Sequence, residues 1–174
     1  MDIIIKSFNR PYYLDRCILS ILKNVKGDFK IKIVDDGTPK KYLERIKEKH
    51  QVEIIPTINY LQKSKNIEEG KENNGFVIPT ESWRKAVEEA SDYFLITEDD
   101  VWFTNQINCN ELIEEMKSNK IHLTKLGILG IFSDDNYAEI KPISKNLETT
   151  YPLKTFTANQ FVMDLFMFNK LKFF

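Results

Sequence analysis

This sequence has few cysteines and no long apolar run. Cys17 and Cys109 are its two cysteines, too few for a disulfide framework or a cysteine-based zinc cluster. The longest apolar runs, such as residues 165–168, are far too short to cross a bilayer. The 25 Lys and Arg residues nearly balance the 26 Asp and Glu residues, which leaves a net charge of -1 and no overall basic field. We therefore expect no transmembrane segment, no nucleic-acid partner and a cytoplasmic location.

Glycine-rich phosphate loops are also missing. The chain contains neither G-x-G-x-x-G nor G-x-x-x-x-G-K-[ST], so a bound phosphate would have to be held by side chains or a metal ion. Arginine forks bind phosphates well, but the chain has only four arginines: Arg10, Arg16, Arg45 and Arg84. Either each arginine has a specific task, or the coding sequence simply favours lysine.

The sequence does contain strand and helix patterns in alternation, as is typical of a parallel α/β fold. The 174 residues are 42% hydrophobic and 29% charged, an ordinary balance for one globular domain. Short β-branched runs predict strands at residues 3–8, 31–34, 52–55, 93–97 and 126–132. Apolar residues at helical spacing predict helices at 14–25, after the N-cap Thr38, at 83–90 and at 110–119, and a last apolar segment spans 161–168. We predict a Rossmann-like, mainly parallel mixed sheet with helices on both faces.

The segment 62–75 has almost no apolar content and breaks this pattern. We predict a solvent-exposed loop there. A loop of this length inside a compact domain is either a lid or binding segment, or plain disorder.

Unusual polar clusters follow three of the predicted strands. Residues 7–10 follow the first strand, Asp35-Asp36 follow the second, and residues 98–100 follow the fourth. Right-handed crossovers place the carboxyl ends of parallel strands along one edge of the sheet, where ligands of such sheets bind. We expect the three clusters to meet at that edge.

Three consecutive carboxylates, Glu98, Asp99 and Asp100, end a strand that should be buried. Two like charges about 4 Å apart repel by about 4 kcal/mol at an effective dielectric of about 20. The following residues 101–103 supply no cation, and carboxylates without cysteine or histidine suit Mg²⁺ or Mn²⁺. Because such ions are usually shared with substrate phosphates, the triplet predicts a metal ion and a diphosphate-bearing ligand. Taken alone, the triplet is better explained as a solvated acidic turn.

Asp35 and Asp36 would lie where a nucleotide binds in such a sheet. Carboxylates there can accept hydrogen bonds from a base N–H or from ribose hydroxyls. The alternative is a tight turn at Asp36-Gly37 that only leads into the next helix. Phe8 could stack on the base and Arg10 could pair with phosphate oxygens, although a lone phenylalanine is more often a core residue.

These clusters, in this order, resemble the nucleotide-sugar half of GT-A glycosyltransferases, especially family 2. The resemblance covers about residues 1–105 and rests on Ser7-Phe8-Asn9-Arg10-Pro11, Val34-Asp35-Asp36-Gly37-Thr38 and Ile96-Thr97-Glu98-Asp99-Asp100-Val101. It implies a GT-A fold and an inverting, metal-dependent transfer of a sugar from a nucleotide-diphosphate sugar. Mn²⁺ or Mg²⁺ would be the cofactor. The acceptor, whether glycan, lipid or protein, is not identified by the sequence.

The resemblance implies that the first two clusters bind the nucleotide. In the family, the residues at the positions of Phe8 and of the pair Asp35 and Asp36 contact the nucleobase and the ribose. Asn9 and Arg10, in the same segment as Phe8, would also lie against the nucleotide sugar.

The third cluster is similar to the DxD motif of the family. Asp100, its last carboxylate, would hold the metal ion that bridges the diphosphate, while Glu98 and Asp99 would face the ribose and the donor sugar. Arg84 resembles an arginine on the preceding helix that reaches toward the nucleotide. That helix usually begins with Ala-Arg-Asn, and residues 82–85 match only the arginine.

Residues 106–174 would form an abbreviated acceptor half, which departs from the family. Members usually run longer and carry an acidic general base and a histidine metal ligand well beyond the DxD motif. Asp164, within an apolar segment, is the better candidate for the base, and a structural role in binding backbone groups is the alternative. Residues 134–135 are more typical of a turn. His50 and His122 are predicted to lie at the surface, not to be the late ligand.

Two other functions fit parts of the pattern. The short C-terminal half fits a non-catalytic nucleotide-sugar-binding module or a fragment of a longer transferase. Residues 33–36 are also similar to receiver domains, but those domains carry the acidic pair after the first strand, and here a complete strand–helix unit precedes it. A metal-dependent glycosyltransferase is therefore the leading hypothesis, with the whole chain as one domain.

Overall fold

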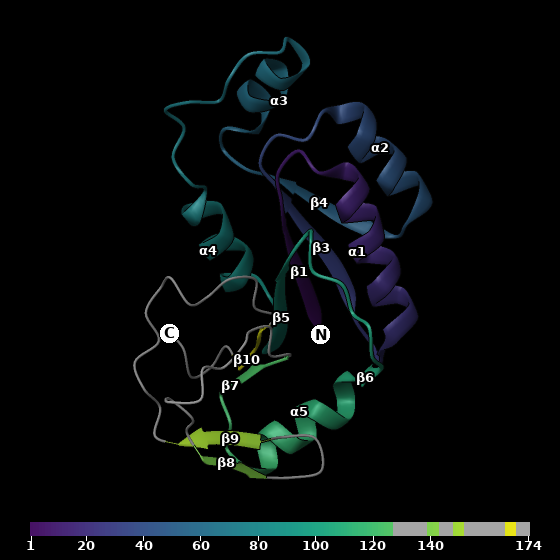
Figure 1. Cartoon of the computed structure of the whole chain (residues 1–174), viewed down its shortest axis with the longest axis vertical. Coiled ribbons are helices and arrows are strands. Elements are labelled where there is room, and N and C mark those ends of the chain that lie inside the picture. Colours follow the sequence, from purple (N-terminus) through teal and green to yellow (C-terminus); the bar gives the residue numbers. More distant parts are fainter. Residues whose placement is uncertain (127–138, 143–147, 152–165, 170–174) are drawn as a thin grey trace.

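The computed structural model describes residues 1–126, 139–142, 148–151 and 166–169, in which strands and helices alternate (Figure 1). In chain order the elements are β1 (Asp2–Ser7), α1 (Pro11–Asn24), β2 (Val25–Lys26), β3 (Lys30–Asp35), α2 (Lys40–Lys49), β4 (Val52–Pro56), α3 (Tyr60–Glu68), α4 (Thr80–Glu88), β5 (Tyr93–Glu98), β6 (Ile107–Asn108), α5 (Cys109–Ser118), β7 (Leu123–Lys125), β8 (Glu139–Pro142), β9 (Glu148–Tyr151) and β10 (Phe166–Asn169).

The main sheet has six strands in the order β4-β3-β1-β5-β10-β7. Strands β4, β3, β1 and β5 are parallel, whereas β10 runs antiparallel to both β5 and β7. At the carboxyl end of β1, Ser7 pairs with Asp35 of β3 and Lys6 pairs with Glu98 of β5. The predicted α/β fold with a mainly parallel mixed sheet is confirmed, and the three polar clusters lie at one edge of it.

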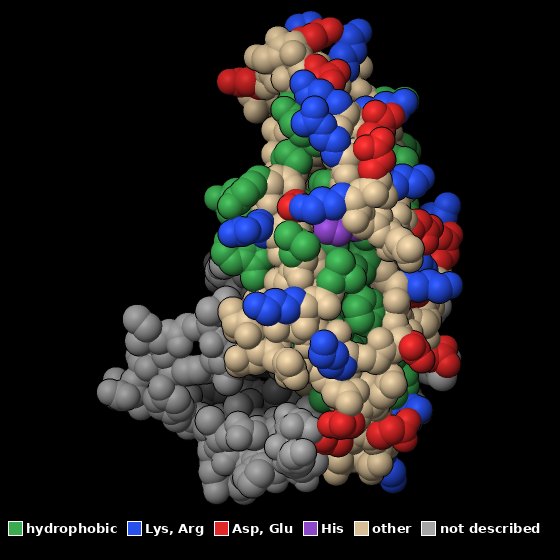
Figure 2. All heavy atoms as spheres, turned by 90° about the vertical axis from the view of Figure 1, so that its right-hand side faces the viewer, with side chains coloured by type: hydrophobic (Ala, Val, Ile, Leu, Met, Phe, Trp, Pro, Cys, Tyr) green, Lys and Arg blue, Asp and Glu red, His purple; other side chains and the backbone are tan. Residues whose placement is uncertain are grey.

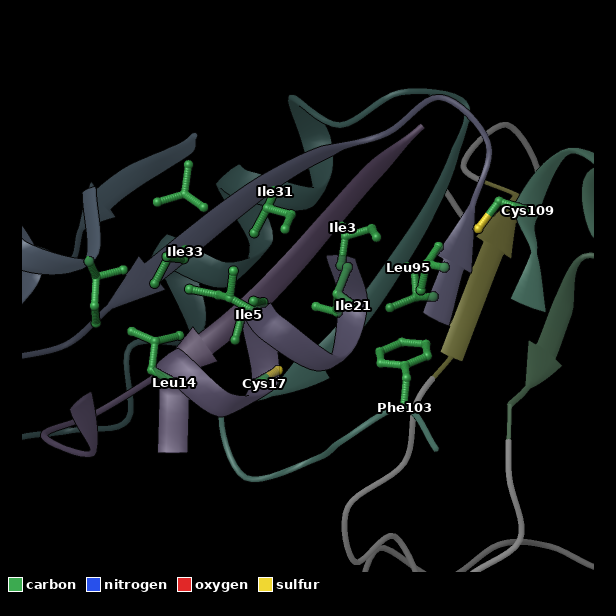
Figure 3. Close-up of a cluster of buried hydrophobic side chains, with 14 of the residues drawn as sticks. Ile3, Ile5, Leu14, Cys17, Ile21, Ile31, Ile33, Leu95, Phe103 and Cys109 are labelled. Carbon is green, nitrogen blue, oxygen red and sulfur yellow. The ribbon is translucent and has the colours of Figure 1, made fainter. Parts of the chain in front are cut away.

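The larger hydrophobic core lies between the sheet and helices α1, α2 and α5 (Figure 3). Alternate residues of β1, Ile3 and Ile5, contribute to it from the sheet. Helix α1 adds four buried residues of its predicted apolar stripe, Leu14, Cys17, Ile18 and Ile21, whereas Leu22 of the same stripe is exposed. Burying a side chain of leucine size stabilises the fold by about 1.5–3 kcal/mol. This packing holds the start of α1, and with it the first polar cluster, at the edge of the sheet.

Helix α4 covers the opposite face of the sheet. Its buried Ala86 and the following Ala90 pack with Ile4, Val34 and Phe94 in a second, smaller cluster. The small alanine side chains allow the helix to lie close to the strands. Helices therefore cover both faces, as predicted. Among the described residues, no helix is both long enough and apolar enough to span a membrane.

The outer surface formed by α1 and α2 carries hydrophobic, basic and acidic side chains. Figure 2 shows hydrophobic side chains there between Lys and Arg side chains. Tyr12, Leu19 and Leu22 of α1 are among the exposed hydrophobic residues. The basic residues thus alternate with apolar and acidic ones on this face, in keeping with the near-zero net charge.

Helix α3 shows that the prediction of a loop over residues 62–75 is wrong for residues 62–68. Its sequence has no apolar stripe, so pattern alone indicates a loop. The helix instead buries two polar residues, Lys63 and Ser64. Tertiary contacts of these side chains, and not an amphipathic pattern, hold α3 in place. Residues 69–79, between α3 and α4, form neither helix nor strand.

His50 is buried, so the prediction of a surface histidine is wrong. It follows α2 and is only 6% exposed. Its Nε2 lies 2.8 Å from Oδ1 of Asp15 on α1, and the Asp15 carboxylate also accepts a hydrogen bond from Lys49 at 2.8 Å. These polar contacts tie the end of α2 to α1.

The C-terminal elements differ in position from the predicted ones. Strand β7 ends just before the predicted range 126–132, of which the structure describes only residue 126. Strand β10 falls at the end of the predicted apolar segment and inserts between β5 and β7. Asp164 and residues 134–135 lie outside the described residues.

Candidate functional site

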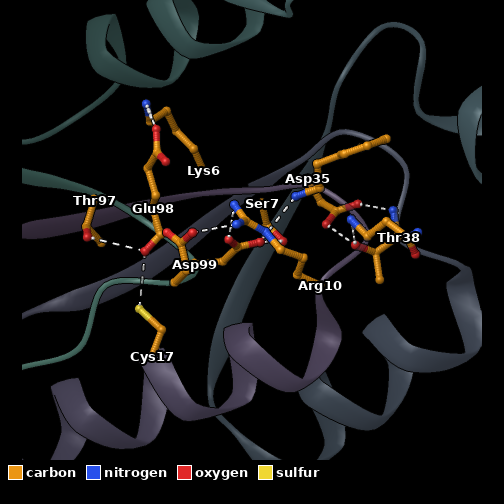
Figure 4. A network of polar contacts seen from close by, with 12 residues as sticks. Lys6, Ser7, Arg10, Cys17, Asp35, Thr38, Thr97, Glu98 and Asp99 are labelled. Carbon is orange, nitrogen blue, oxygen red and sulfur yellow. Dashed lines mark hydrogen bonds and ion pairs between the residues drawn. The ribbon is translucent and has the colours of Figure 1, made fainter. Parts of the chain in front are cut away.

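Asp99 is the buried centre of the polar network at the sheet edge. It follows β5 and has no exposed surface. Its Oδ2 accepts hydrogen bonds from the Ser7 hydroxyl at 3.0 Å and from the Phe8 backbone N–H at 3.3 Å (Figure 4). Because β1 and β5 are neighbours, this one carboxylate joins the first and third clusters predicted from the sequence.

Arg10 and Lys6 supply positive charge to the acidic triplet. Nη2 of Arg10 lies 2.7 Å from Oδ1 of Asp99, and its Nη1 lies 2.5 Å from Oδ2 of Asp100. Nζ of Lys6 lies 2.8 Å from Oε1 of Glu98. Residues 101–103 supply no cation, as the sequence indicates, but Lys6 on the neighbouring strand β1 and Arg10 just after that strand do. These two cations offset part of the negative charge of the three carboxylates.

Burial raises the pKa of Asp99 to about 6, from an ordinary value of 3.8. The Arg10 guanidinium and the hydrogen bonds from Ser7 and Phe8 lower this pKa, whereas the Asp100 carboxylate raises it further. Because this pKa is higher in the folded protein than in the unfolded chain, the folded state is more stable when Asp99 is protonated. Below the network, burial raises the pKa of the Cys17 thiol to about 12, so this thiol is inert at neutral pH.

Asp100 keeps one carboxylate oxygen without a hydrogen bond. Its Oδ2 pairs with Arg10, whereas its Oδ1 is buried and has no hydrogen-bond partner. Within the described part of the chain, no group of three His, Cys, Asp or Glu side chains forms a metal cluster. The donor set therefore fits a divalent cation held by one carboxylate and completed by oxygens of a bound ligand, as is usual for Mg²⁺.

Asp35 ends β3 and shapes the turn that follows. Its buried carboxylate accepts hydrogen bonds from the backbone N–H groups of Gly37 and Thr38, at 3.0 and 2.7 Å, and from the Thr38 hydroxyl at 2.6 Å. Burial raises the pKa of Asp35, and these bonds oppose the shift. The prediction that Thr38 caps α2 is wrong, because α2 has no side-chain cap. The Thr38 hydroxyl oxygen instead accepts a hydrogen bond from the Asn9 N–H at 2.9 Å.

Asp36, the next residue, pairs with α3. Its Oδ1 accepts a hydrogen bond from the Thr57 hydroxyl, and its Oδ2 lies 2.5 Å from Nζ of Lys63. Asp36 and Lys63 are both buried. The Phe8 ring, 42% exposed, has its centroid 5.6 Å from the same ammonium. The structure thus brings Phe8 and Asp36 together around a lysine.

Gly37 allows α3 to approach this pair. Its φ is +142°, and a Cβ there would lie 2.8 Å from Cβ of Lys63. We expect Gly37→Ala to lower the free energy of unfolding by about 3 kcal/mol, through backbone strain and overpacking. Gly70→Ala is the matched control, since Gly70 has a φ of +67° and open space around it and should cost about 1 kcal/mol. Urea unfolding measures both, and equal losses would show that the contact with Lys63 has no energetic weight.

Arg84 is held by contacts on its own helix. It pairs with Glu81 and Glu88 on α4, and its side chain is 57% exposed. Such pairs along a helix contribute about 0.2–0.5 kcal/mol each. Of the predicted site residues, the structure thus joins residues 8–10, 35–36 and 98–100 at the sheet edge, whereas Arg84 is engaged within α4.

Four further side chains of this edge were not predicted: Lys6, Thr57, Lys63 and Phe76. Lys6 follows three consecutive isoleucines in β1, and Thr57 follows β4 at the same sheet edge, so both carried a local signal. Lys63 and Phe76 lie in and beside the segment that reads as a loop, where no sequence pattern singles them out.

Comparisons with known proteins place the chain in a family. A sequence profile of Glycosyl transferase family 2 matches residues 2–173. A comparison with curated proteins finds no match. Among solved structures, S. aureus TarS is 13% identical, with a TM-score of 0.50 over 80% of this chain and 24% of its own.

Two further solved structures have lower TM-scores. The galactosyltransferase LgtC, in complex with donor and acceptor sugar analogs, is 16% identical, with a TM-score of 0.42 over 61% of this chain and 40% of its own. The mannosyltransferase PcManGT from Pyrobaculum calidifontis, in complex with GDP-Man and Mn²⁺, is 13% identical, with a TM-score of 0.44 over 67% of this chain and 31% of its own.

The chain therefore spans less than half the length of each of these solved structures. At such low identity the likeness to TarS concerns the fold alone, and it agrees with the sheet order described above. The family profile, in contrast, covers nearly the whole sequence. We conclude that the chain belongs to glycosyl transferase family 2 and has the GT-A fold.

Proposed function

We propose that the chain transfers a sugar from a nucleotide-diphosphate sugar to a glycan, lipid or protein acceptor, with Mn²⁺ or Mg²⁺ as cofactor. The observation that supports this best is the meeting of Arg10 with the carboxylate of Asp100, one oxygen of which accepts no hydrogen bond. The guanidinium can pair with a diphosphate, and the carboxylate oxygen without a hydrogen-bond partner can bind the divalent cation of that diphosphate.

On the diphosphate side, Asp100 would hold the metal ion through its Oδ1. Bound there, the ion would supply Lewis-acid stabilisation of the departing diphosphate. Arg10 has five N–H donors in a planar fork, so it can pair with phosphate oxygens while it keeps its contact with Asp99. Asp99 is fixed by Ser7 and Phe8 and would orient this guanidinium. Glu98, paired with Lys6, would face the donor sugar.

On the nucleoside side, the partly exposed Phe8 ring would stack on the base. Asp36 would accept a hydrogen bond from the base, whereas Asp35 and the Asn9 N–H hold the backbone of the two turns in position. Arg84 would have to leave its pairs on α4 to reach the nucleotide.

The acceptor would bind through residues 106–174, and the donor through residues 1–105. For an inverting displacement, a general base must take the proton of the acceptor hydroxyl within hydrogen-bond reach. We propose Asp164 for this task on the sequence alone, since it lies outside the described residues.

A non-catalytic nucleotide-sugar-binding module, or a fragment of a longer transferase, is the second candidate. It is suggested by the match to TarS, of which this chain covers 24%. Donor binding without transfer, and without slow hydrolysis of the donor, would support this second candidate.

Isothermal titration calorimetry with UDP- and GDP-sugars, with and without Mn²⁺, tests the proposal. We expect at least one donor to bind, and Mn²⁺ to tighten its binding about tenfold or more, which corresponds to about 1.4 kcal/mol. Mn²⁺ titrated without nucleotide is the control and should bind weakly, because among the described residues no group of three His, Cys, Asp or Glu side chains could hold it. Metal-independent binding, or no binding of any donor, would contradict the proposal.

A further inference from the structure

Lys63 is a buried cation beside the carboxylate that would meet the nucleobase. It lies on α3, is 5% exposed, and its Nζ pairs with Oδ2 of Asp36. The Phe8 and Phe76 rings flank the same ammonium, with centroids 5.6 and 5.4 Å away. Thr57 binds the other oxygen of Asp36, so the carboxylate has a defined orientation.

The pair offers opposite hydrogen-bonding capacity at adjacent positions. A carboxylate only accepts hydrogen bonds, whereas an ammonium only donates and has three N–H groups. Within the described residues, the acceptor that the structure gives to the Lys63 ammonium is Asp36. Asp36 and Lys63 therefore present an acceptor next to a donor, with hydrogen-bonding capacity left on both.

Building on the function proposed above, we propose that Lys63, together with Asp36, selects donors whose base carries a ring N–H beside a carbonyl. Uracil and thymine present this edge at N3 and O4, and guanine presents it at N1 and O6. The N–H would donate to Asp36, and the carbonyl oxygen would accept from Lys63. Adenine and cytosine present a bare ring nitrogen beside an amino group, which would place acceptor against acceptor and donor against donor.

The two flanking rings are suited to the same ligand. Aromatic side chains stack on bases without regard to their sequence, so Phe8 and Phe76 would add affinity and not discrimination. Because the pair is buried and Phe76 lies against it, the base must displace the Phe76 side chain to reach Lys63. Phe76 belongs to the segment 69–79, which has neither helix nor strand to hold it.

A purely structural role for Lys63 makes a different prediction. If the ion pair with Asp36 only fastened α3 to the sheet, its loss would weaken the binding of every nucleotide by a similar factor. The ratio between nucleotides, and not the affinity for one of them, therefore separates selection of the base from support of the fold.

The experiment is equilibrium binding of UDP, GDP, dTDP, CDP and ADP to the full chain in the presence of Mn²⁺. We expect UDP, GDP or dTDP to bind about 10- to 100-fold more tightly than CDP and ADP, the range expected for a hydrogen bond to a charged group. Lys63→Met should reduce this preference to about threefold or less, with little change in the affinity for ADP. Lys65→Met, an exposed lysine on the same helix, is the matched control and should keep the preference.

Lys63→Met leaves the buried Asp36 without its cation, and this variant could fail to fold. The double variant Asp36→Asn/Lys63→Met removes both charges and is therefore measured as well. It should bind all five nucleotides with similar affinity. Equal weakening of all nucleotides in Lys63→Met, or wild-type binding of ADP as tight as that of UDP and GDP, would overturn the inference and leave the proposed function intact. Binding of no nucleotide at all would overturn both.

Discussion

Asp100→Ala is expected to abolish the Mn²⁺ dependence of donor binding and to reduce sugar transfer by about 1,000-fold, as loss of a group that stabilises developing charge typically does. The melting temperature should stay unchanged or rise. The Asp100 carboxylate raises the pKa of its buried neighbour Asp99, so its removal relieves a repulsion inside the network. Arg10 keeps its contact with Asp99 in this variant. Calorimetry with and without Mn²⁺, thermal unfolding and a transfer assay measure the three quantities.

Asp92→Ala is the control for Asp100→Ala. Asp92 is an exposed aspartate before β5, on the same stretch of chain but at the other end of the strand. Its replacement should leave metal dependence, transfer and melting temperature unchanged. A large fall in the melting temperature of Asp100→Ala would instead show that Asp100 is a structural residue, and the assignment of the metal site would then be wrong.

Arg10→Ala is expected to destabilise the protein in a pH-dependent way. Arg10 is the strongest of the groups that lower the pKa of Asp99, so without it this pKa rises above about 6. When the pKa of a carboxyl group is higher in the folded state than in the unfolded state, deprotonation destabilises the protein. The stability falls as the pH rises from the unfolded pKa to the folded pKa. The variant should therefore match the wild type near pH 5 and be less stable by about 2 kcal/mol at pH 8. This is less than the 3–5 kcal/mol typical of breaking a buried pair, because Arg10 is partly exposed.

Urea unfolding at pH 5 and pH 8 measures this effect. Arg16→Ala is the control, since Arg16 lies on α1 near Arg10 and contacts the Tyr12 ring, not the acidic triplet. It should show no difference between the two pH values beyond that of the wild type. Equal destabilisation of Arg10→Ala at both pH values would mean that the charge on Asp99 is not the cause. Arg10→Ala should also weaken donor binding, because the same guanidinium would hold the diphosphate.

Much of the fold can be read from local pattern. The central parallel strands are buried on both faces, so β1 and β5 contain continuous β-branched or apolar runs, and α1 shows a regular apolar stripe. Helix α3 could not be predicted in this way. It is held by the polar side chain of Lys63 in contact with Asp36, and a buried ion pair leaves no apolar periodicity in the sequence.

The carboxylates of the candidate site were placed correctly at the sheet edge by the same local pattern. Their electrostatic partners were not. The sequence interpretation, in which a metal ion balances the acidic triplet, lacked Lys6 and Arg10, which lie 92 and 90 residues away from Glu98 and Asp100 in the chain. A metal ion is therefore not the sole counter-charge of the triplet, and we propose it as a part of the reaction.

Local chemistry was enough to place β1, β3, β5, helix α1 and the acidic strand ends, because each follows from how a short segment meets water or the core. Which cation meets which carboxylate depended on three-dimensional arrangement. Arg10 reaches Asp99 and Asp100 because β1 and β5 are adjacent in the sheet, and Lys63 reaches Asp36 because α3 packs over the turn at Gly37. Strand order and helix packing are properties of the whole chain, and no short segment carries them.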